Sequence, residues 1–231
     1  MSTINKAETP EAMESIGEAM SKTELFFENN GKVISYGIFG LLLVAAVIFG
    51  YKTLIVEPKM EQASEMILNA QSIFEQSTPD YDAALNGNDS GAGFLEVIEN
   101  YGSTPAGNLA AHYAGICYIK LGDLDNAAKY LAQYKAVESV PASIINAQNL
   151  GLQADIAVDK GDYTSAMNLY NKAIAISDNS YTAPLYMYKS ALVAIETGDN
   201  AKATELLEKI ISNYPNAVEA RSAEKYLGTI K

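Results

Sequence analysis

The sequence has few of the residue types on which protein chemistry often depends. Its 231 residues include no tryptophan, one cysteine (Cys117), one histidine (His112) and one arginine (Arg221). A single cysteine excludes an internal disulfide framework, and a single histidine excludes catalytic histidine pairs and histidine-based metal clusters. The net charge of −12 argues against binding to nucleic acid or to an anionic lipid surface, because both require basic patches.

Charge is also missing from one long stretch near the N-terminus. Val33–Tyr51 is a run of 19 uncharged residues between Lys32 and Lys52. At about 1.5 Å per helical residue it covers roughly 28 Å, close to the thickness of a bilayer's hydrocarbon core. A cleaved signal peptide requires a basic start and a small-residue cleavage site, whereas here 32 residues with six glutamates come first. We therefore predict an uncleaved transmembrane helix over residues 33–52.

Two features of this predicted anchor concern its packing and its orientation. Ala46 and Gly50 have the small-xxx-small spacing that permits close packing between membrane helices. Lysines flank the run equally on both sides, so the positive-inside rule gives no orientation. An uncleaved anchor behind a short leader favours a cytoplasmic N-terminus, which would place the larger C-terminal part across the membrane.

An internal repeat organises the rest of the chain. The pattern G-D-x-x-x-A occurs three times, at Gly122, Gly161 and Gly198, with spacings of 39 and 37 residues. Glycine ends a helix by adopting a left-handed conformation, and the aspartate that follows caps the next helix. The pattern therefore predicts three antiparallel helix pairs: Leu109–Leu121 with Leu124–Ala136, Ile145–Lys160 with Tyr163–Ile176, and Pro184–Thr197 with Ala201–Asn213.

These motifs resemble the tetratricopeptide repeat (TPR) family. Small residues occupy the family's positions in both helices of each pair: Gly115, Ala154 and Ala191 in the first helices, and Ala127, Ala166 and Ala203 in the second. Pro215 closes the third repeat as in the family pattern. The long spacings and the lack of tryptophan depart from that pattern and suggest lengthened helices or loops. The resemblance implies an all-α fold, a single N-terminal transmembrane helix followed by a TPR-like α-solenoid of helix hairpins.

Four segments follow from these patterns. We expect a short acidic cytoplasmic tail over 1–32, the transmembrane helix over 33–52, a membrane-proximal helix with an incomplete leading repeat over 53–103, and three repeats with a capping helix over 104–231. Apolar residues between Met60 and Phe74 trace one face of the membrane-proximal helix. Gly93–Tyr101 is predicted as the second helix of the leading repeat and Ala217–Gly228 as the terminal cap.

The sequence contains no constellation of catalytic or metal-binding residues, so we expect neither an enzyme nor a cofactor. Ordinary packing is the expected role of His112, and Cys117 is expected to be a buried structural thiol. Asp123, Asp162 and Asp199 follow the turn glycines. Their regular placement predicts helix caps rather than metal ligands.

A solenoid without such chemistry usually acts as a binding scaffold, because stacked repeats form a long concave face. In TPR proteins that face comes mainly from the first helices. The resemblance thereby implies eight partner-binding candidates on a mixed apolar and acidic surface: His112, Ile116, Lys120, Asp155, Asp159, Tyr188, Leu192 and Glu196. Tyr188 and Leu192 are an apolar pair in a polar rim, as interface hot spots require. We expect this face to select the partner and the anchor to raise its local concentration.

The order of acidic tail, single anchor and acidic repeats resembles the YfgM-like family of ancillary SecYEG translocon subunits. Two stretches, Ser21–Lys32 and Ala84–Asp123, look like the versions found in Bacteroidetes-type bacteria. The resemblance implies a single-pass inner-membrane protein with a cytoplasmic N-terminus and a periplasmic TPR domain. Its implied partners are SecYEG, a PpiD-like membrane-anchored peptidyl-prolyl isomerase and exported polypeptides. The family has no catalytic residues to transfer.

A second interpretation stays open at this point. The TPR motif is not specific for one function, so the alternative is a scaffold in another bacterial envelope or outer-membrane biogenesis complex. Co-purification in mild detergent separates the two interpretations, because recovery of SecY with a PpiD-like protein fits only the first. The resemblance does not say which residues contact a partner.

Overall fold

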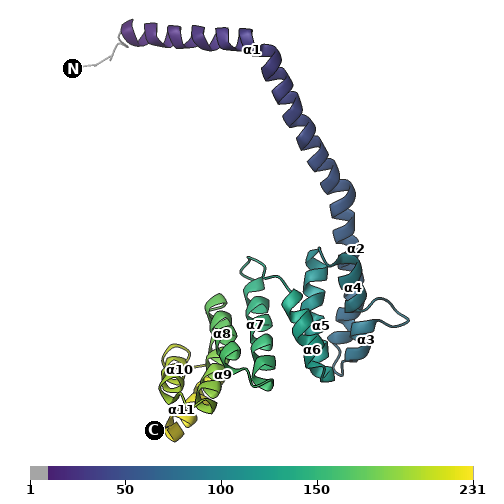
Figure 1. Ribbon diagram of the computed structural model, residues 1–231, viewed down its shortest axis with the longest axis vertical. Coiled ribbons are helices and arrows are strands. Elements are labelled where there is room, and N and C mark those ends of the chain that lie inside the picture. Colours follow the sequence, from purple (N-terminus) through teal and green to yellow (C-terminus); the bar gives the residue numbers. More distant parts are fainter. Residues whose placement is uncertain (1–9, 231) are drawn as a thin grey trace, which may run out of the picture. The chain divides into compact units, whose positions relative to one another are not determined.

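Every regular element in the described part of the chain is a helix, which confirms the all-α prediction. The computed structural model describes residues 10–230, with side chains from residue 24 onward (Figure 1). Residues 1–9 of the predicted acidic tail therefore lie outside the described range. The chain divides into two compact units, Met1–Pro58 and Lys59–Lys231, which we describe separately.

The first unit holds the uncharged run. Helix α1 spans Pro10–Tyr51, and the π-helical turn η1 spans Lys52–Val56. One helical stretch near the N-terminus is long and apolar enough to cross a membrane. The large apolar side chains of the run are exposed, among them Leu41 at 73% and Phe49 at 69%. Apolar surface of this extent is unfavourable in water and is suited to a bilayer.

The second unit begins with an aromatic cluster that packs α2 against the helices that follow it. The bounds are α2 Glu57–Phe74, α3 Tyr81–Asn86 and α4 Phe94–Tyr101. The predicted apolar face of α2 is buried through Ala63, Ile67, Ala70 and Ile73. The Phe94 ring stacks on Tyr113 with centroids 5.2 Å apart, and Phe74 meets Phe94 edge-on at 6.1 Å. This burial removes the apolar face of α2 from water at the start of the array.

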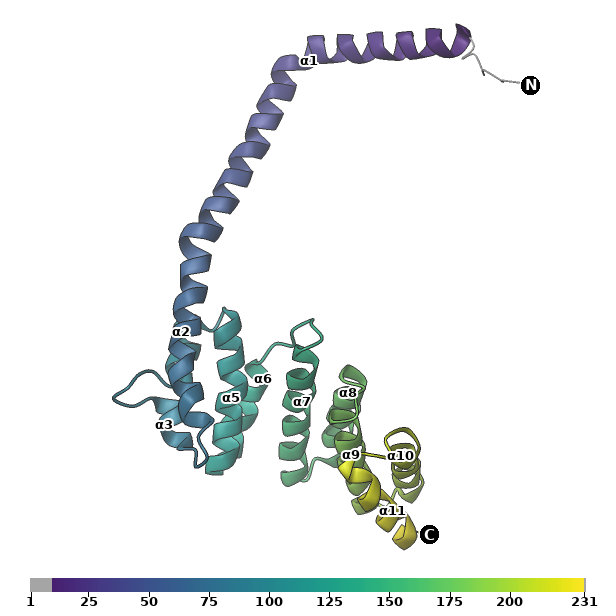
Figure 2. The same cartoon turned by 180° about the vertical axis from the view of Figure 1, so that it is seen from behind.

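Three helix hairpins and a final helix complete the second unit, and consecutive helices pack side by side (Figures 1 and 2). The bounds are α5 Pro105–Leu121, α6 Leu124–Gln133, α7 Ala142–Asp159, α8 Tyr163–Ile176, α9 Thr182–Glu196, α10 Asn200–Asn213 and α11 Val218–Ile230. The pairs α5/α6, α7/α8 and α9/α10 are the hairpins that the repeated G-D-x-x-x-A pattern predicts. The predicted solenoid of helix hairpins is confirmed.

Local backbone chemistry closes each hairpin. The turn glycines adopt left-handed φ angles of 83° at Gly122, 75° at Gly161 and 79° at Gly198. Each following aspartate then accepts a hydrogen bond at 3.0 Å from the backbone N–H three residues later. These bonds satisfy N–H groups at the start of α6, α8 and α10 that have no partner within the helix. The predicted cap role of Asp123, Asp162 and Asp199 is confirmed.

Small residues let the paired helices approach each other closely. Ala127, Ala166 and Ala203 have no exposed surface. A β-carbon added at Gly115 would lie 2.5 Å from Cγ of Leu131, which is too close for any real side chain. The volume at these positions is therefore limited by the neighbouring helix.

The long first spacing results from an extended loop between α6 and α7. Helix α6 ends at Gln133 rather than at the predicted Ala136, because Tyr134 adopts an extended backbone with ψ of 129°. The buried side chain of Asn146 then holds the loop. Its Oδ1 accepts hydrogen bonds from the Tyr134 hydroxyl at 2.8 Å and the Val137 N–H at 3.1 Å. Its Nδ2 donates to the Val137 carbonyl at 2.9 Å.

Candidate functional site

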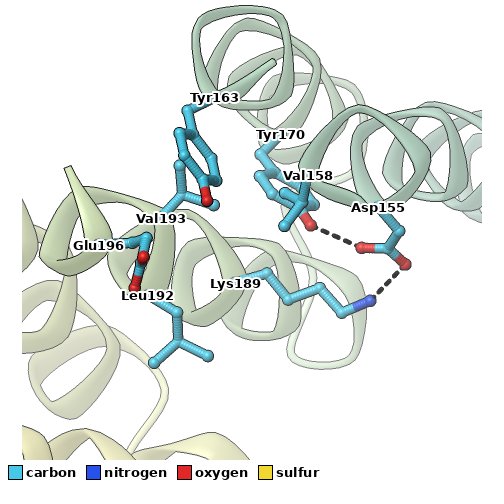
Figure 3. Close-up of a pocket in the computed structure, with 8 residues that line it drawn as sticks. All are labelled: Asp155, Val158, Tyr163, Tyr170, Lys189, Leu192, Val193 and Glu196. Atoms are coloured by element: carbon cyan, nitrogen blue, oxygen red, sulfur yellow. Dashed lines mark hydrogen bonds and ion pairs between the residues drawn. The ribbon is translucent and has the colours of Figure 1, made fainter. Parts of the chain in front are cut away.

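A cavity of about 400 Å³ lies between α7, α8 and α9 (Figure 3). Its volume falls within the range of clefts that receive small ligands or side chains. Each of the three helices contributes to the lining, which consists of Asp155, Val158, Tyr163, Tyr170, Lys189, Leu192, Val193 and Glu196. The two helices of the middle hairpin and the first helix of the next repeat thus form one site.

Asp155 connects the three helices at one side of the cavity. Its Oδ1 accepts a hydrogen bond of 2.6 Å from the Tyr170 hydroxyl, and its Oδ2 pairs with Lys189 Nζ at 2.6 Å (Figure 3). The side chains of Asp155 and Lys189 are about one third exposed, at 33% and 32%. Both carboxylate oxygens of Asp155 are therefore already engaged within the protein.

The protonation state of Tyr170 is set by its surroundings. Burial raises the pKa of its hydroxyl, and the hydrogen bond to Asp155 and the charges of Asp155 and Asp159 raise it further. Burial also raises the pKa of the neighbouring Tyr186, whose ring lies 6.2 Å from that of Tyr170. At neutral pH Tyr170 is a hydrogen-bond donor that holds Asp155 in place.

The opposite side of the cavity is apolar and ends at a carboxylate. Figure 3 shows Tyr163, Val193 and Glu196 together on this side, away from the Asp155–Lys189 pair. Val193 is buried, Leu192 and Tyr163 are half-buried, and Glu196 is exposed. The cavity thus combines an aliphatic and aromatic wall with a negative charge at its mouth.

Three of the eight predicted partner-binding residues come together in this cavity. Asp155, Leu192 and Glu196 line it, and Asp159 lies one helical turn beyond Asp155 on α7. Ile116 and Lys120 lie on α5, outside the cavity, with Ile116 half-buried and Lys120 exposed. Their contact with a partner stays a prediction.

The prediction that His112 belongs to a binding face is wrong. His112 is only 2% exposed, and its Nδ1 accepts a hydrogen bond of 3.1 Å from the buried Asn149 amide. Burial lowers the pKa of His112 from 6.5 to about 4, although a hydrogen bond with Gln148 partly opposes that shift. His112 is therefore a neutral side chain that joins α5 to α7 inside the array, which fits the packing role also expected of it.

Tyr188 also differs from its predicted place. Its ring meets Tyr226 of α11 edge-on, with centroids 5.9 Å apart, and it packs into the cluster between α9 and the terminal helix. Tyr188 does not line the cavity that contains Leu192. Tyr188 and Leu192, which were predicted as an apolar pair, therefore have different neighbours, because α11 covers one side of α9.

Five residues that line the cavity are not among the predicted site residues: Val158, Tyr163, Tyr170, Lys189 and Val193. Two of them, Tyr163 and Tyr170, lie on α8, the second helix of its hairpin, whereas all eight predicted residues lie on the first helices of the hairpins. Tyr170 lies four positions after Ala166 on α8, and its hydrogen bond with Asp155 joins it to another helix, which the repeat pattern does not specify.

Cys117 has the buried position expected of a structural thiol. It has no exposed surface, and burial raises the pKa of its thiol to about 12. A thiol with so high a pKa is almost entirely protonated at neutral pH and is a poor nucleophile. Among the described residues, no group of three or more histidine, cysteine, aspartate or glutamate side chains could hold a metal ion.

Comparisons with known families identify the repeats. Tetratricopeptide-repeat patterns match residues 110–137 and 186–217 in one form and residues 147–180 in another. Three segments of this chain match tetratricopeptide repeats. The TPR matches coincide with the hairpins α5/α6, α7/α8 and α9/α10, and they imply a protein-interaction scaffold of a generally non-catalytic kind.

Two solved structures are similar to this chain, and the first of them supports the same fold. A crystal structure of MamA is 17% identical over 74% of this chain and 90% of that chain, with a TM-score of 0.51. TPR-like repeats of a Podosopora anserina protein assigned as a kinesin light chain are 15% identical over 76% of this chain and 92% of that chain, with a TM-score of 0.48. No curated protein shows significant similarity to the sequence.

Proposed function

We propose that this TPR protein is a non-catalytic ancillary subunit of the SecYEG translocon that links it to a PpiD-like periplasmic chaperone during protein export. The proposal assigns residues 1–32 to the cytoplasm, 33–52 to the inner membrane, and both 53–103 and 104–231 to the periplasm. Its support is the resemblance of Ser21–Lys32 and Ala84–Asp123 to YfgM-like proteins. The repeats support a binding role.

The combination of an exposed apolar helix with a TPR array in one chain carries the proposal. An anchor confines the array to the bilayer surface, where a partner held in the same membrane meets it at high effective concentration. Ala46 and Gly50 would pack against a membrane helix of that partner. The cavity between α7 and α9 would hold a segment of it outside the membrane.

Protease accessibility tests the topology. A protease added to intact spheroplasts should digest the chain from Lys52 onward and leave a cytoplasmic marker protein whole. Detergent lysis is the control, because it shows that the region is cleavable once the membrane is open. Protection of residues 52–231 before lysis and digestion after it would contradict the periplasmic assignment.

Co-purification tests the partners. The full chain, tagged at its C-terminus and extracted in mild detergent, should recover SecY together with a PpiD-like protein, as identified by mass spectrometry. An untagged strain is the control for background binding. Recovery of outer-membrane biogenesis proteins without SecY would favour the alternative scaffold and contradict the translocon assignment.

A further inference from the structure

Two carboxylates beside the cavity are free to bind. Glu196 lines the cavity and is exposed, and Asp159 is exposed on α7. Neither side chain forms an ion pair or a hydrogen bond with another described side chain. Asp159 follows Val158 directly and lies one helical turn after Asp155, and both of these residues line the cavity.

The other charges of the cavity compensate one another. Lys189 is the only cation in the lining, and its Nζ is paired with Asp155 at 2.6 Å. The Tyr170 hydroxyl occupies the second oxygen of Asp155. The charge that remains available to a ligand is therefore negative and comes from Glu196 and Asp159. A cationic ligand group would complement it.

The apolar wall determines what kind of cation would fit. Val158, Leu192 and Val193 present aliphatic surface, and Tyr163 adds an aromatic ring (Figure 3). A lysine or arginine side chain covers such a wall with its methylene stem while its charged end reaches a carboxylate. Arginine is favoured over lysine, because its planar guanidinium also stacks on an aromatic ring and binds a carboxylate through two parallel hydrogen bonds.

We propose that the cavity between α7, α8 and α9 binds a partner segment in which an arginine stands next to aliphatic residues. The arginine stem and its aliphatic neighbours lie against Val158, Leu192 and Val193, and the guanidinium binds Glu196 and Asp159. Asp155 is not a contact of the ligand in this arrangement but holds α9 against α7 and α8. The inference rests on the proposed function only in that the array binds a protein segment.

Two matched synthetic peptides test the chemistry of the ligand. One is a fluorescein-labelled peptide of alternating leucine and arginine, and the other carries citrulline, a neutral isostere, in place of each arginine. Fluorescence polarisation is measured with the full chain in neutral detergent, and binding to empty micelles is subtracted. We expect the arginine peptide to bind about tenfold more tightly than the citrulline peptide, as for one desolvated charge pair.

A double variant that removes the charge of both carboxylates tests the location of the binding site. Glu196→Gln with Asp159→Asn should weaken arginine-peptide binding about tenfold and abolish the preference over citrulline. The control variant Glu96→Gln with Glu99→Gln removes the same charge from exposed positions of α4 and should bind as the natural chain does. The inference is overturned if the two peptides bind equally well or if neither binds. It is also overturned if the control variant loses as much affinity for the arginine peptide as the double variant does.

Co-purification of the same variants separates this inference from the proposed function. If the arginine peptide binds in the predicted manner while SecY is not recovered, the ligand chemistry stands and the translocon assignment fails. If SecY and a PpiD-like protein are recovered with the natural chain while neither peptide binds, the assignment stands and the cavity is not the contact.

Discussion

Ala166 lies at the contact between the two helices of the middle hairpin. It has no exposed surface between α7 and α8, one helical turn after the Gly161 turn. Ala166→Leu adds three carbon atoms where no space exists, so we expect a loss of about 1–3 kcal/mol in the free energy of unfolding. Chemical denaturation of the full chain in detergent, followed by circular dichroism, measures it. Ala132→Leu at an exposed site of α6 is the control, and equal stability of the two variants would contradict the assigned packing.

His112 makes the stability of the array dependent on pH. Its pKa is about 4 in the folded chain and 6.5 when unperturbed, because burial disfavours the charged ring. Between these values the unfolded chain binds a proton that the folded chain does not, so stability falls as pH falls through this window. The full loss corresponds to about 3 kcal/mol at pH values below both pKa values.

The variant His112→Gln isolates this contribution from that of the carboxylates. It removes the titrating ring but keeps a side chain that accepts a hydrogen bond from Asn149. As the pH falls from 6.5 to 4, the free energy of unfolding of the natural chain should decrease relative to that of the variant. A difference independent of pH over that window would mean that the ring is accessible to protons in the folded state.

At the scale of elements, Asn146 of α7 holds the loop between the first and second hairpins, and Asn108 of α5 also binds this loop at Lys135. Asn146 binds the Val137 N–H, the Val137 carbonyl and the Tyr134 hydroxyl, and it is 7% exposed. Asn146→Ala removes these three part-buried hydrogen bonds, and each contributes about 0.5–1.5 kcal/mol to stability. We expect faster amide hydrogen exchange across residues 134–141. Asn168→Ala at an exposed site of α8 is the control, and unchanged exchange at Val137 would contradict the role of Asn146.

For the whole molecule, the proposed function offers two surfaces that could hold a partner: the cavity and the proposed membrane helix. Tyr188→Ala is a poor probe of the first surface, because Tyr188 packs on Tyr226 and its loss would disturb α11. Leu192→Ala with Glu196→Gln changes only half-buried and exposed positions. We expect this pair to reduce capture of the proposed PpiD-like partner about tenfold or more, as truncation of a hot spot does. Quantitative co-purification measures it.

The matched variant changes the proposed membrane helix. Ala46→Leu with Gly50→Leu removes the small residues of the anchor, and we expect it to lower capture less than the cavity variant does, since the anchor mainly raises local concentration. If the anchor variant abolishes capture while the cavity variant recovers the partner in full, recognition lies in the bilayer and the cavity is not the selective surface.

Much of the fold could be predicted from the sequence, because the signals that close each hairpin act over a few residues. Gly122, Gly161 and Gly198 adopt left-handed φ angles as predicted, and the aspartates beside them cap the next helices. Tyr163–Ile176 was predicted with the bounds of α8. The end of α6 was not, because the loop that ends it is held by Asn146, a residue of the next helix.

The sequence by itself determined the helix pairs, the turns between them and the uncharged run of the anchor, because these depend on local backbone preferences and on the spacing of apolar residues. Only the tertiary structure decided which side chains share a surface. The buried His112 is hydrogen-bonded to Asn149, which lies 37 positions away in the sequence. Asp155 pairs with Lys189, which lies 34 positions away. Contacts over such distances depend on how whole helices stack, and no local preference specifies that stacking.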